Sequence, residues 1–220
     1  MSLSLREIET LLSQLPWRQF QTPRLQLEQY TTPVHLAARI AHHVALSVPA
    51  KERGSQLVVD LGTGTGVLAF ALHLAGFDHI VGVDIDSDAL QLAKVNAEKL
   101  QELCSTSAER PVDFALMDIQ TSSLALTGAP FDIAVLNPPF GTRRHAADVA
   151  FLEVACRVSR RLVYSLHKST TRGYISKKLE RLGYAARVYA QLRFDLAATY
   201  AFHTRRSVDL EVDLWQVELK

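Results

Sequence analysis

The spacing of apolar residues changes about fifty residues into the chain. Before that point, apolar side chains recur every three or four positions, which predicts two amphipathic helices. The first begins at Leu5 and ends near Pro16, and the second runs to about Leu46. Thr32 is a residue type that caps helices and Pro33 suits a first helical position, so we expect the second helix to begin there. Residues 1–50 are therefore predicted to form an N-terminal helical cap.

From residue 51 onward, short apolar runs alternate with amphipathic segments. This alternation predicts an α/β core over 51–220, with a seven-stranded, mostly parallel sheet and helices on both faces. Because no helix separates the last two strands, we expect them to form an antiparallel hairpin at one edge. In the last strand, Asp209, Glu211 and Asp213 alternate with apolar residues and predict a solvated acidic face. The predicted strands are 56–62, 79–84, 112–118, 131–137, 161–168, 185–194 and 207–219, and the predicted helices are 67–77, 87–100, 148–159 and 170–183.

Composition limits the classes of function. The chain has 220 residues, 48% of them hydrophobic and 21% charged, which suits one domain with an ample core. The formal net charge is +1, so binding to a nucleic acid would have to come from local basic patches. Cys104 and Cys156 are expected to be reduced thiols, and no metal-ligand constellation is present. The sequence shows neither a secretion signal nor a membrane span, so we expect a cytoplasmic and/or nuclear protein with no membrane partner.

A glycine-rich turn follows the first predicted strand. The stretch DLGTGTG, residues 60–66, has glycine at every second position near its end, which permits a tight turn and a close backbone approach by a ligand. Its spacing is neither that of a dinucleotide-binding loop nor that of a P-loop. Since ligands of open α/β sheets bind at the carboxyl ends of the strands, we predict a cofactor site here. The candidate residues are Asp60, Gly62, Gly64, Thr65, Gly66 and Val67.

Acidic residues end the next two predicted strands. The Asp84 carboxylate can accept hydrogen bonds from both hydroxyls of a ribose. The alternative, in which Asp84 caps the following helix, is less favoured because Asp86 is available for that role. Ile85 would then lie beside an adenine ring. Asp118 ends the third strand and could accept a hydrogen bond from the adenine amine, with Ile119 packing nearby.

The fourth predicted strand ends in NPPF, residues 137–140. Proline lacks an N–H group and fixes φ, so two prolines cannot continue a central strand. With the acidic glycine loop and Asp84, this sequence resembles the pattern of class I S-adenosylmethionine methyltransferases that act on planar amines or amides. The Asn137 side-chain oxygen and the Pro138 carbonyl would accept the two N–H groups of the target, with Pro138 and Pro139 stiffening the backbone. Phe140 would either stack on the target ring or pack in the core.

The chain as a whole resembles the METTL-type adenine-N6 methyltransferases of small-subunit ribosomal RNA. The resemblance implies a Rossmann-like class I methyltransferase fold, S-adenosylmethionine as cofactor and S-adenosylhomocysteine as product. It also implies that Gln29 and Thr32 lie in a segment covering the cofactor, and that a small zinc-ribbon activator subunit forms a heterodimer with the chain. That subunit would extend an exposed sheet edge and cover apolar surface. The matching blocks, in order, are LEQYTT (27–32), DLGTGTG (60–66), GVDID (82–86), NPPFGT (137–142), DVAFL (148–152), YSLHKSTTR (164–172), LRFDLAATYAFH (192–203) and SVDLEVDL (207–214).

Basic clusters follow several strands on the rim where the motifs lie. In a chain with a net charge of +1, three such clusters predict a track for the phosphates of RNA. The candidate nucleic-acid contacts are Arg143, Arg144, His167, Lys168, His203 and Arg206.

Three other functions remain open from the residues alone. A protein-glutamine methyltransferase uses the same acceptor chemistry, but such enzymes usually carry an N-terminal peptide-binding domain, and only about 50 residues precede this core. A DNA adenine methyltransferase would need a target-recognition domain, for which 220 residues leave little room. A non-enzymatic scaffold would not need an intact NPPF sequence.

Overall fold

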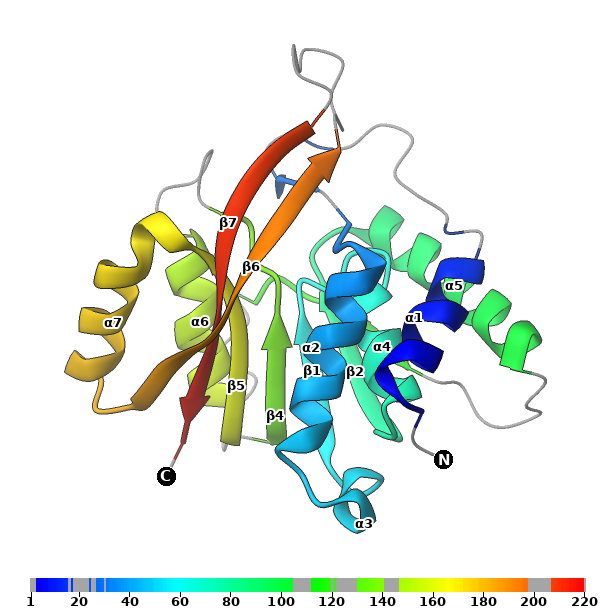
Figure 1. Cartoon of the computed structure of the whole chain (residues 1–220), viewed down its shortest axis with the longest axis horizontal. Coiled ribbons are helices and arrows are strands. Elements are labelled where there is room, and N and C mark those ends of the chain that lie inside the picture. The colour runs from blue at the N-terminus through cyan, green and yellow to red at the C-terminus, as the bar shows by residue number, and fades with distance from the viewer. Residues whose placement is uncertain are drawn as a thin grey trace.

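The computed structural model describes residues 3–15, 17, 24, 27–29, 31–104, 112–119, 121, 130–140, 147–197 and 207–219. Within these residues, seven strands form one sheet in the order β3-β2-β1-β4-β5-β7-β6 (Figure 1). Strands β1 to β5 are parallel, whereas β7 is antiparallel to both β5 and β6. The predicted class of fold is therefore confirmed. The strands are β1 (Leu57–Leu61), β2 (His79–Asp84), β3 (Asp113–Leu116), β4 (Phe131–Leu136), β5 (Ser159–Lys168), β6 (Ala185–Ala197) and β7 (Ser207–Glu218).

Helices cover both faces of the sheet, and each face has its own hydrophobic cluster. One cluster joins α1 (Leu5–Gln14), α2 (Val34–Leu46) and α4 (Val67–Leu74) to the sheet, together with Leu100 of α5 (Ser87–Cys104). The other joins α6 (Ala147–Val158) and α7 (Arg172–Arg181) to the opposite face. Helices α1 and α2 pack directly against the same core as α4, while the division of the chain at residue 50 stays a prediction.

Most element boundaries lie within a few residues of the predicted ones, with α5 and β6 longer and β3 shorter than expected. The short helix α3 (Ala50–Arg53) was not predicted. The predicted cap of α2 is wrong, because the helix begins at Val34 with Pro33 at its cap position and with no side-chain cap. The hydroxyl of Thr32 is used elsewhere, as described below.

The expected acidic face of β7 is also wrong at one position. Asp213 is fully buried, and its carboxylate accepts hydrogen bonds from the Ser169 hydroxyl at 2.7 Å and from the Arg172 guanidinium at 2.7 Å. The reason is topological: β7 lies between β5 and β6, and the short helix η3 (Ser169–Thr171) and the start of α7 contact it there. No described helix combines the length and the apolar character needed to span a bilayer.

Candidate active site

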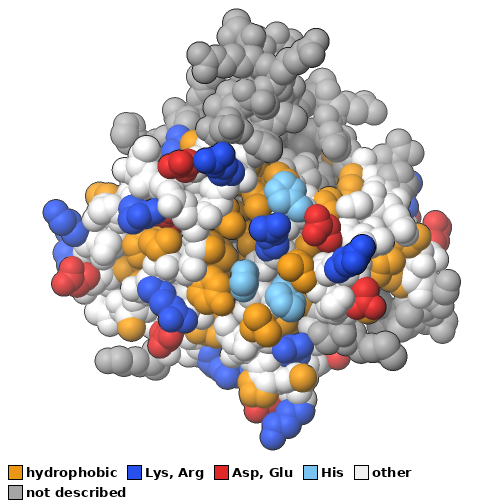
Figure 2. All heavy atoms as spheres, viewed as in Figure 1, with side chains coloured by type: hydrophobic (Ala, Val, Ile, Leu, Met, Phe, Trp, Pro, Cys, Tyr) orange, Lys and Arg blue, Asp and Glu red, His pale blue; other side chains and the backbone are white. Residues whose placement is uncertain are grey.

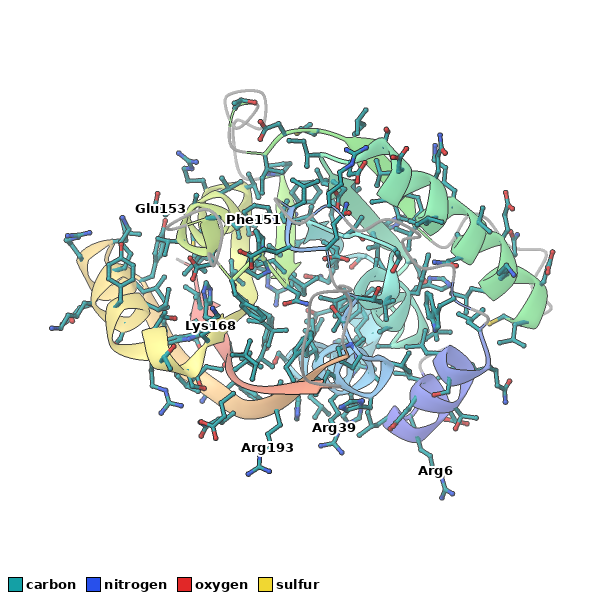
Figure 3. All side chains as sticks on the ribbon, turned by 90° about the horizontal axis from the view of Figure 1, so that it is seen from above. Arg6, Arg39, Phe151, Glu153, Lys168 and Arg193 are labelled. Atoms are coloured by element: carbon teal, nitrogen blue, oxygen red, sulfur yellow. The ribbon has the colours of Figure 1, made fainter. Side chains whose placement is uncertain are left out.

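The glycine loop connects β1 to α4 with backbone conformations that favour glycine. Gly62, Gly64 and Gly66 have φ values of +76°, +56° and +89°. A Cβ atom at Gly66 would lie 2.6 Å from the Phe70 ring, and one at Gly62 would lie 3.1 Å from the ring of Phe151 on α6 (labelled in Figure 3). The alternate glycines are therefore required by φ and, at two positions, by space.

This loop forms one wall of a pocket at the carboxyl ends of β1 and β4. The lining also includes Asn137 and the two residues before Pro33. The pocket thus brings together the predicted cofactor loop and the predicted catalytic asparagine, which are about 70 residues apart in the sequence. Its lining residues are Thr31, Thr32, Asp60, Gly62, Thr63, Gly64, Thr65, Val67, Leu68 and Asn137.

Two carboxylates give this end of the sheet its electrostatic character. Asp60 lines the pocket and is 1% exposed, and its Oδ2 accepts a hydrogen bond from the Thr63 hydroxyl at 2.8 Å. Burial, opposed by that hydrogen bond and assisted by the nearby charge of Asp84, raises the pKa of Asp60 to about 7. Burial also raises the pKa of Asp84, although its carboxylate accepts hydrogen bonds from the backbone N–H groups of Asp86 at 2.9 Å and Gly64 at 2.8 Å. A cationic ligand would relieve the cost of keeping these groups ionised.

Four more of the predicted cofactor residues, Asp84, Ile85, Asp118 and Ile119, follow or end the adjacent strands β2 and β3, outside the pocket lining. Ile85 is 49% exposed, which leaves its apolar side chain accessible to a flat ring. Asp118 is half-buried and Ile119 is 5% exposed, and both follow β3 next to Asp84, since the Met117 N–H donates to the Asp84 carbonyl at 2.9 Å. The roles of Ile85, Asp118 and Ile119 toward an adenine stay predictions.

The segment before α2 is tied to the start of α5 through Asp86. As predicted, Asp86 caps α5: its Oδ1 accepts from the Asp88 N–H at 3.1 Å. The same buried carboxylate also accepts from the Gln29 amide Nε2 at 2.5 Å and pairs with Arg24 at 3.3 Å. The Gln29 Oε1 accepts from the Arg24 N–H at 2.7 Å, so this amide anchors the segment, and its contact with a cofactor stays a prediction.

Asn137, the first residue after β4, has one paired and one unpaired end. Its Nδ2 donates to the Thr32 Oγ1 at 2.9 Å, whereas its Oδ1 is buried and has no hydrogen-bond partner among the described residues. Buried acceptors are normally paired, so an unpaired one beside a pocket indicates a position for a donor from a ligand. Pro138 is buried and Pro139 half-buried. Sequence reasoning predicted the asparagine but gave no sign of its contact with Thr32.

Phe140 packs at the edge of this site. Its side chain is 6% exposed, its ring meets Phe194 of β6 edge to face at 6.0 Å between centroids, and the Lys168 ammonium lies 6.0 Å from its centroid. Core packing is thus the role seen here, and stacking on a target ring stays a prediction. Lys168 is half-buried at this rim, and its contact with a phosphate stays a prediction as well.

The predicted phosphate contact of His167 is wrong. This side chain is fully buried: its Nδ1 lies 3.1 Å from Asp148 Oδ2 and its Nε2 lies 2.7 Å from the Ser165 hydroxyl. The network joins the start of α6 to β5, and sequence reasoning missed it. Arg143, Arg144, His203 and Arg206 lie outside the described residues. Among the described residues, no group of three or more His, Cys, Asp or Glu side chains could hold a metal ion.

Comparisons with known proteins agree with this arrangement. The profile of a family described as "Methyltransferase domain" matches residues 53–182. The chain is 40% identical to the rRNA N(6)-adenosine-methyltransferase Mettl5 of Drosophila melanogaster, over 99% of this chain and 97% of that protein. It is 35% identical to the protein of the same description from Danio rerio, over 96% and 97%. A crystal structure from Pyrococcus horikoshii, described as a candidate RNA methyltransferase, superposes with a TM-score of 0.79 at 28% identity, covering 100% of this chain and 99% of that one.

Proposed function

This chain belongs to the family of rRNA N(6)-adenosine-methyltransferases and is an S-adenosylmethionine-dependent RNA adenine methyltransferase, and from that premise we propose that its substrate is one adenine of small-subunit ribosomal RNA. The observation that carries the assignment of the site is the buried Oδ1 of Asn137, which has no hydrogen-bond partner among the described residues and belongs to a residue that lines the same pocket as the glycine loop. An exocyclic NH₂ group is the donor that this acceptor lacks.

The residues of the pocket fit the cofactor. The positive-φ glycine loop leaves room for close backbone approach, and Asp60, buried beside it, favours a ligand with positive charge. S-adenosylmethionine, when bound, supplies a methyl group on a sulfonium and carries an ammonium group. We expect Gly62, Thr65 and Val67 to line its methionine part and Asp84 to hold its ribose, with Ile85 beside the adenine.

The chain acts on the target mainly by orientation. An aromatic amine is a weak nucleophile because its lone pair is delocalised into the ring. When Asn137 Oδ1 accepts one N–H and the Pro138 carbonyl accepts the other, the nitrogen becomes more tetrahedral and its lone pair is directed at the methyl group. The Thr32 hydroxyl keeps the amide in that orientation by holding Nδ2. Methyl transfer would break the S–CH₃ bond of the sulfonium and leave S-adenosylhomocysteine, and the proton would then pass from the cationic, acidic N6 to solvent.

The target adenine must leave its stack to reach this acceptor, because Asn137 Oδ1 is buried. Unstacking costs a few kcal/mol, and less where the base is mispaired or single-stranded. We therefore expect an adenine in a single-stranded or mispaired position to be methylated faster than the same adenine in a regular helix. Equal rates for paired and mispaired adenines would contradict base extrusion.

We further propose that the zinc-ribbon activator subunit adds to the β3 edge of the sheet. Among the described strands, β3 pairs with β2 alone, and Leu116 at its end is 62% exposed. Two more apolar side chains are exposed on the neighbouring α5, Val95 at 37% and Leu103 at 38%. The opposite edge, β6, has no large apolar side chain of comparable exposure among its described side chains. An edge strand beside apolar surface is the geometry in which another chain adds a strand.

Co-purification tests this interface. Leu116→Arg should abolish binding of the zinc-ribbon subunit. Tyr174→Arg, at a position of α7 that is 56% exposed, should leave that binding intact. Equal binding by both variants would exclude the β3 edge.

The methylation assay tests the function. The protein, with and without the zinc-ribbon subunit, is incubated with labelled S-adenosylmethionine and either purified small-subunit or large-subunit rRNA, and the RNA is digested to nucleosides. We expect N6-methyladenosine from small-subunit rRNA, and none with Asn137→Ala, which should still bind the cofactor. Label on a glutamine of a ribosomal or release-factor protein would favour the protein methyltransferase, and label in large-subunit rRNA would contradict the choice of subunit.

A further inference from the structure

The outward side of α2 carries basic and histidine side chains without any acidic residue. His35, Arg39 and His42 lie at spacings of four and three residues, which places them in one stripe along the helix. The segment Val34–Leu46 contains no Asp or Glu. Arg39 is exposed, and the two histidines are half-buried. Figure 2 shows histidine side chains gathered around a Lys or Arg side chain, among apolar side chains, in the middle of this face.

Strand β6 adds arginines and a tyrosine to the same side. The Tyr189 ring meets the His43 ring of α2 at 4.9 Å between centroids, and the Arg187 guanidinium lies over Tyr189 at 5.5 Å. His42 continues the row, with its ring 6.2 Å from that of His43. Figure 3 shows Arg39 and Arg193 pointing outward on the same side of the molecule. We call this surface the α2–β6 face; it comprises His35, Arg39, His42, His43, Arg187 and Arg193.

The two exposed arginines of this face, Arg39 and Arg193, keep their guanidinium groups available to a ligand. Elsewhere, Arg160 pairs with Asp132, Arg172 with Asp213, and Lys178 with a glutamate on α6. In the described part of the chain, neither Arg39 nor Arg193 is within ion-pair distance of a carboxylate, although Glu211 stands opposite Arg193 on β7.

Each element of the face is connected to the active site at one point. Helix α2 begins two residues after Thr32, which lines the pocket and holds Asn137. Arg193 directly precedes Phe194, whose ring contacts Phe140 of the NPPF segment. When the target base of an RNA strand occupies the active site, the neighbouring nucleotides would therefore contact this face.

His43 adds a flat ring to the face. Burial, and then the charges of His42 and Arg39, lower the pKa of His43. The imidazole is consequently neutral near pH 7, which suits contact with a base more than with a phosphate.

We propose that the α2–β6 face binds the RNA strand adjoining the target adenine, with Arg39 and Arg193 contacting phosphates and the row of rings contacting unpaired bases. This inference rests on the proposed function for the identity of the RNA. It assigns the RNA contact to residues other than Arg143, Arg144, His203 and Arg206, the candidates of the sequence analysis that lie outside the described residues. Unpaired cations beside planar groups are the chemistry that recognises single-stranded RNA.

Charge reversal at two positions tests the proposal. Arg39→Glu/Arg193→Glu is compared with Lys177→Glu/Arg181→Glu, a matched double reversal at exposed positions of α7, which packs on the other face of the sheet. Binding of a small-subunit rRNA fragment is measured by fluorescence anisotropy at several salt concentrations, and the affinity for S-adenosylmethionine is measured in parallel. Arg39→Lys/Arg193→Lys keeps the charges and should bind RNA nearly as well as the wild type.

The expected result is a loss of RNA affinity and of its salt dependence. The slope of log K against log salt should become shallower by about 1.4 to 1.8, because each lost phosphate contact removes about 0.7 to 0.9. The KM for rRNA should rise about tenfold or more, with cofactor affinity unchanged. If the double reversal lowers the melting temperature, Arg39→Gln/Arg193→Gln replaces it with the same expected change in slope.

An unchanged slope and KM, or equal losses in the α7 control, would overturn the inference. If the wild-type protein does not methylate rRNA, the proposed function fails, but the salt dependence still decides whether this face binds RNA.

Discussion

The hydrogen bond between Thr32 and Asn137 provides the most direct test of the active site. The two residues are 105 positions apart, and Asn137 Nδ2 donates to Thr32 Oγ1 at 2.9 Å. Because the NH₂ group and the oxygen of the amide have similar sizes, this bond decides which of the two points to the substrate. Thr32→Val replaces the hydroxyl by a methyl group of similar size. Asn137 Nδ2 then loses the Thr32 acceptor, and the amide can rotate so that Nδ2 points to the substrate.

The magnitude follows from the burial of this contact. Thr32 is 8% exposed, so water does not readily replace the lost oxygen. Leaving a buried donor unpaired costs about 1–3 kcal/mol. If that energy is what selects the productive orientation of the amide, its loss raises the barrier by the same amount, and kcat falls about 5- to 150-fold.

The assay separates orientation from folding. Single-turnover methylation of rRNA gives the rate of the chemical step, and calorimetry gives the affinity for S-adenosylmethionine. Thr32→Ser retains an acceptor and should stay within about twofold of the wild-type rate, since the change in barrier is then well below 1 kcal/mol. A Thr32→Val enzyme with wild-type kcat, or one whose loss is entirely in cofactor affinity, would refute the reasoning.

Three further predictions concern the pocket and its support. Because the pKa of Asp60 is raised to about 7, its negative charge is lost as pH falls through that value. Calorimetry should therefore show the affinity of the wild type for the cofactor decreasing from about pH 8 to about pH 6. Asp60→Asn should bind the cofactor weakly and with nearly no dependence on pH. Gly66→Ala combines a φ of +89° with a Cβ 2.6 Å from Phe70, so urea titration should show a loss of about 2–5 kcal/mol, against about 1–2 kcal/mol for Gly64→Ala, which meets nothing within 4 Å. Burial would raise the pKa of Asp148, but the hydrogen bond and charge of the buried imidazole outweigh it and lower that pKa. Its stabilisation is therefore present above the unfolded pKa of about 3.9 and is lost as pH falls through the folded value, so Asp148→Asn should lower the melting temperature at about pH 7 more than at about pH 3.

Features that depend on neighbouring residues could be predicted from the sequence. Alternating strands and helices gave the parallel sheet, and the absence of a helix before residue 207 gave the terminal hairpin. The glycine loop was predicted because positive φ is a local property of the backbone at Gly62, Gly64 and Gly66. The position of Asn137 followed from the end of β4 and the general rule for ligand sites in such sheets.

Features that depend on residues distant in the sequence could not be predicted from it. Thr32 satisfies the local rule for a helix cap, yet its hydroxyl bonds Asn137 after 105 residues. His167 lies in a basic segment, but its side chain is buried and its Nδ1 contacts Asp148 on α6. Asp213 belongs to a regular alternation of polar and apolar residues, and Arg172, 41 residues earlier, covers it. In each case a tertiary partner decided the role of a side chain whose type and neighbours indicated another.

The strand order has a consequence for how the enzyme is made. Strand β1 can pair with β2 soon after both leave the ribosome, but its other neighbour is β4, and the Leu57 N–H that bonds Asp132 is 75 residues from it. Closing a loop of that length costs about 4 kcal/mol of chain entropy before the contacts of β4 repay it. Asn137 immediately follows β4, so the catalytic acceptor can be set in place only after the pairing of β4 with β1, which joins the strands most distant in sequence among the described pairs. A nascent chain can thus complete its cofactor loop well before it acquires the group that acts on RNA.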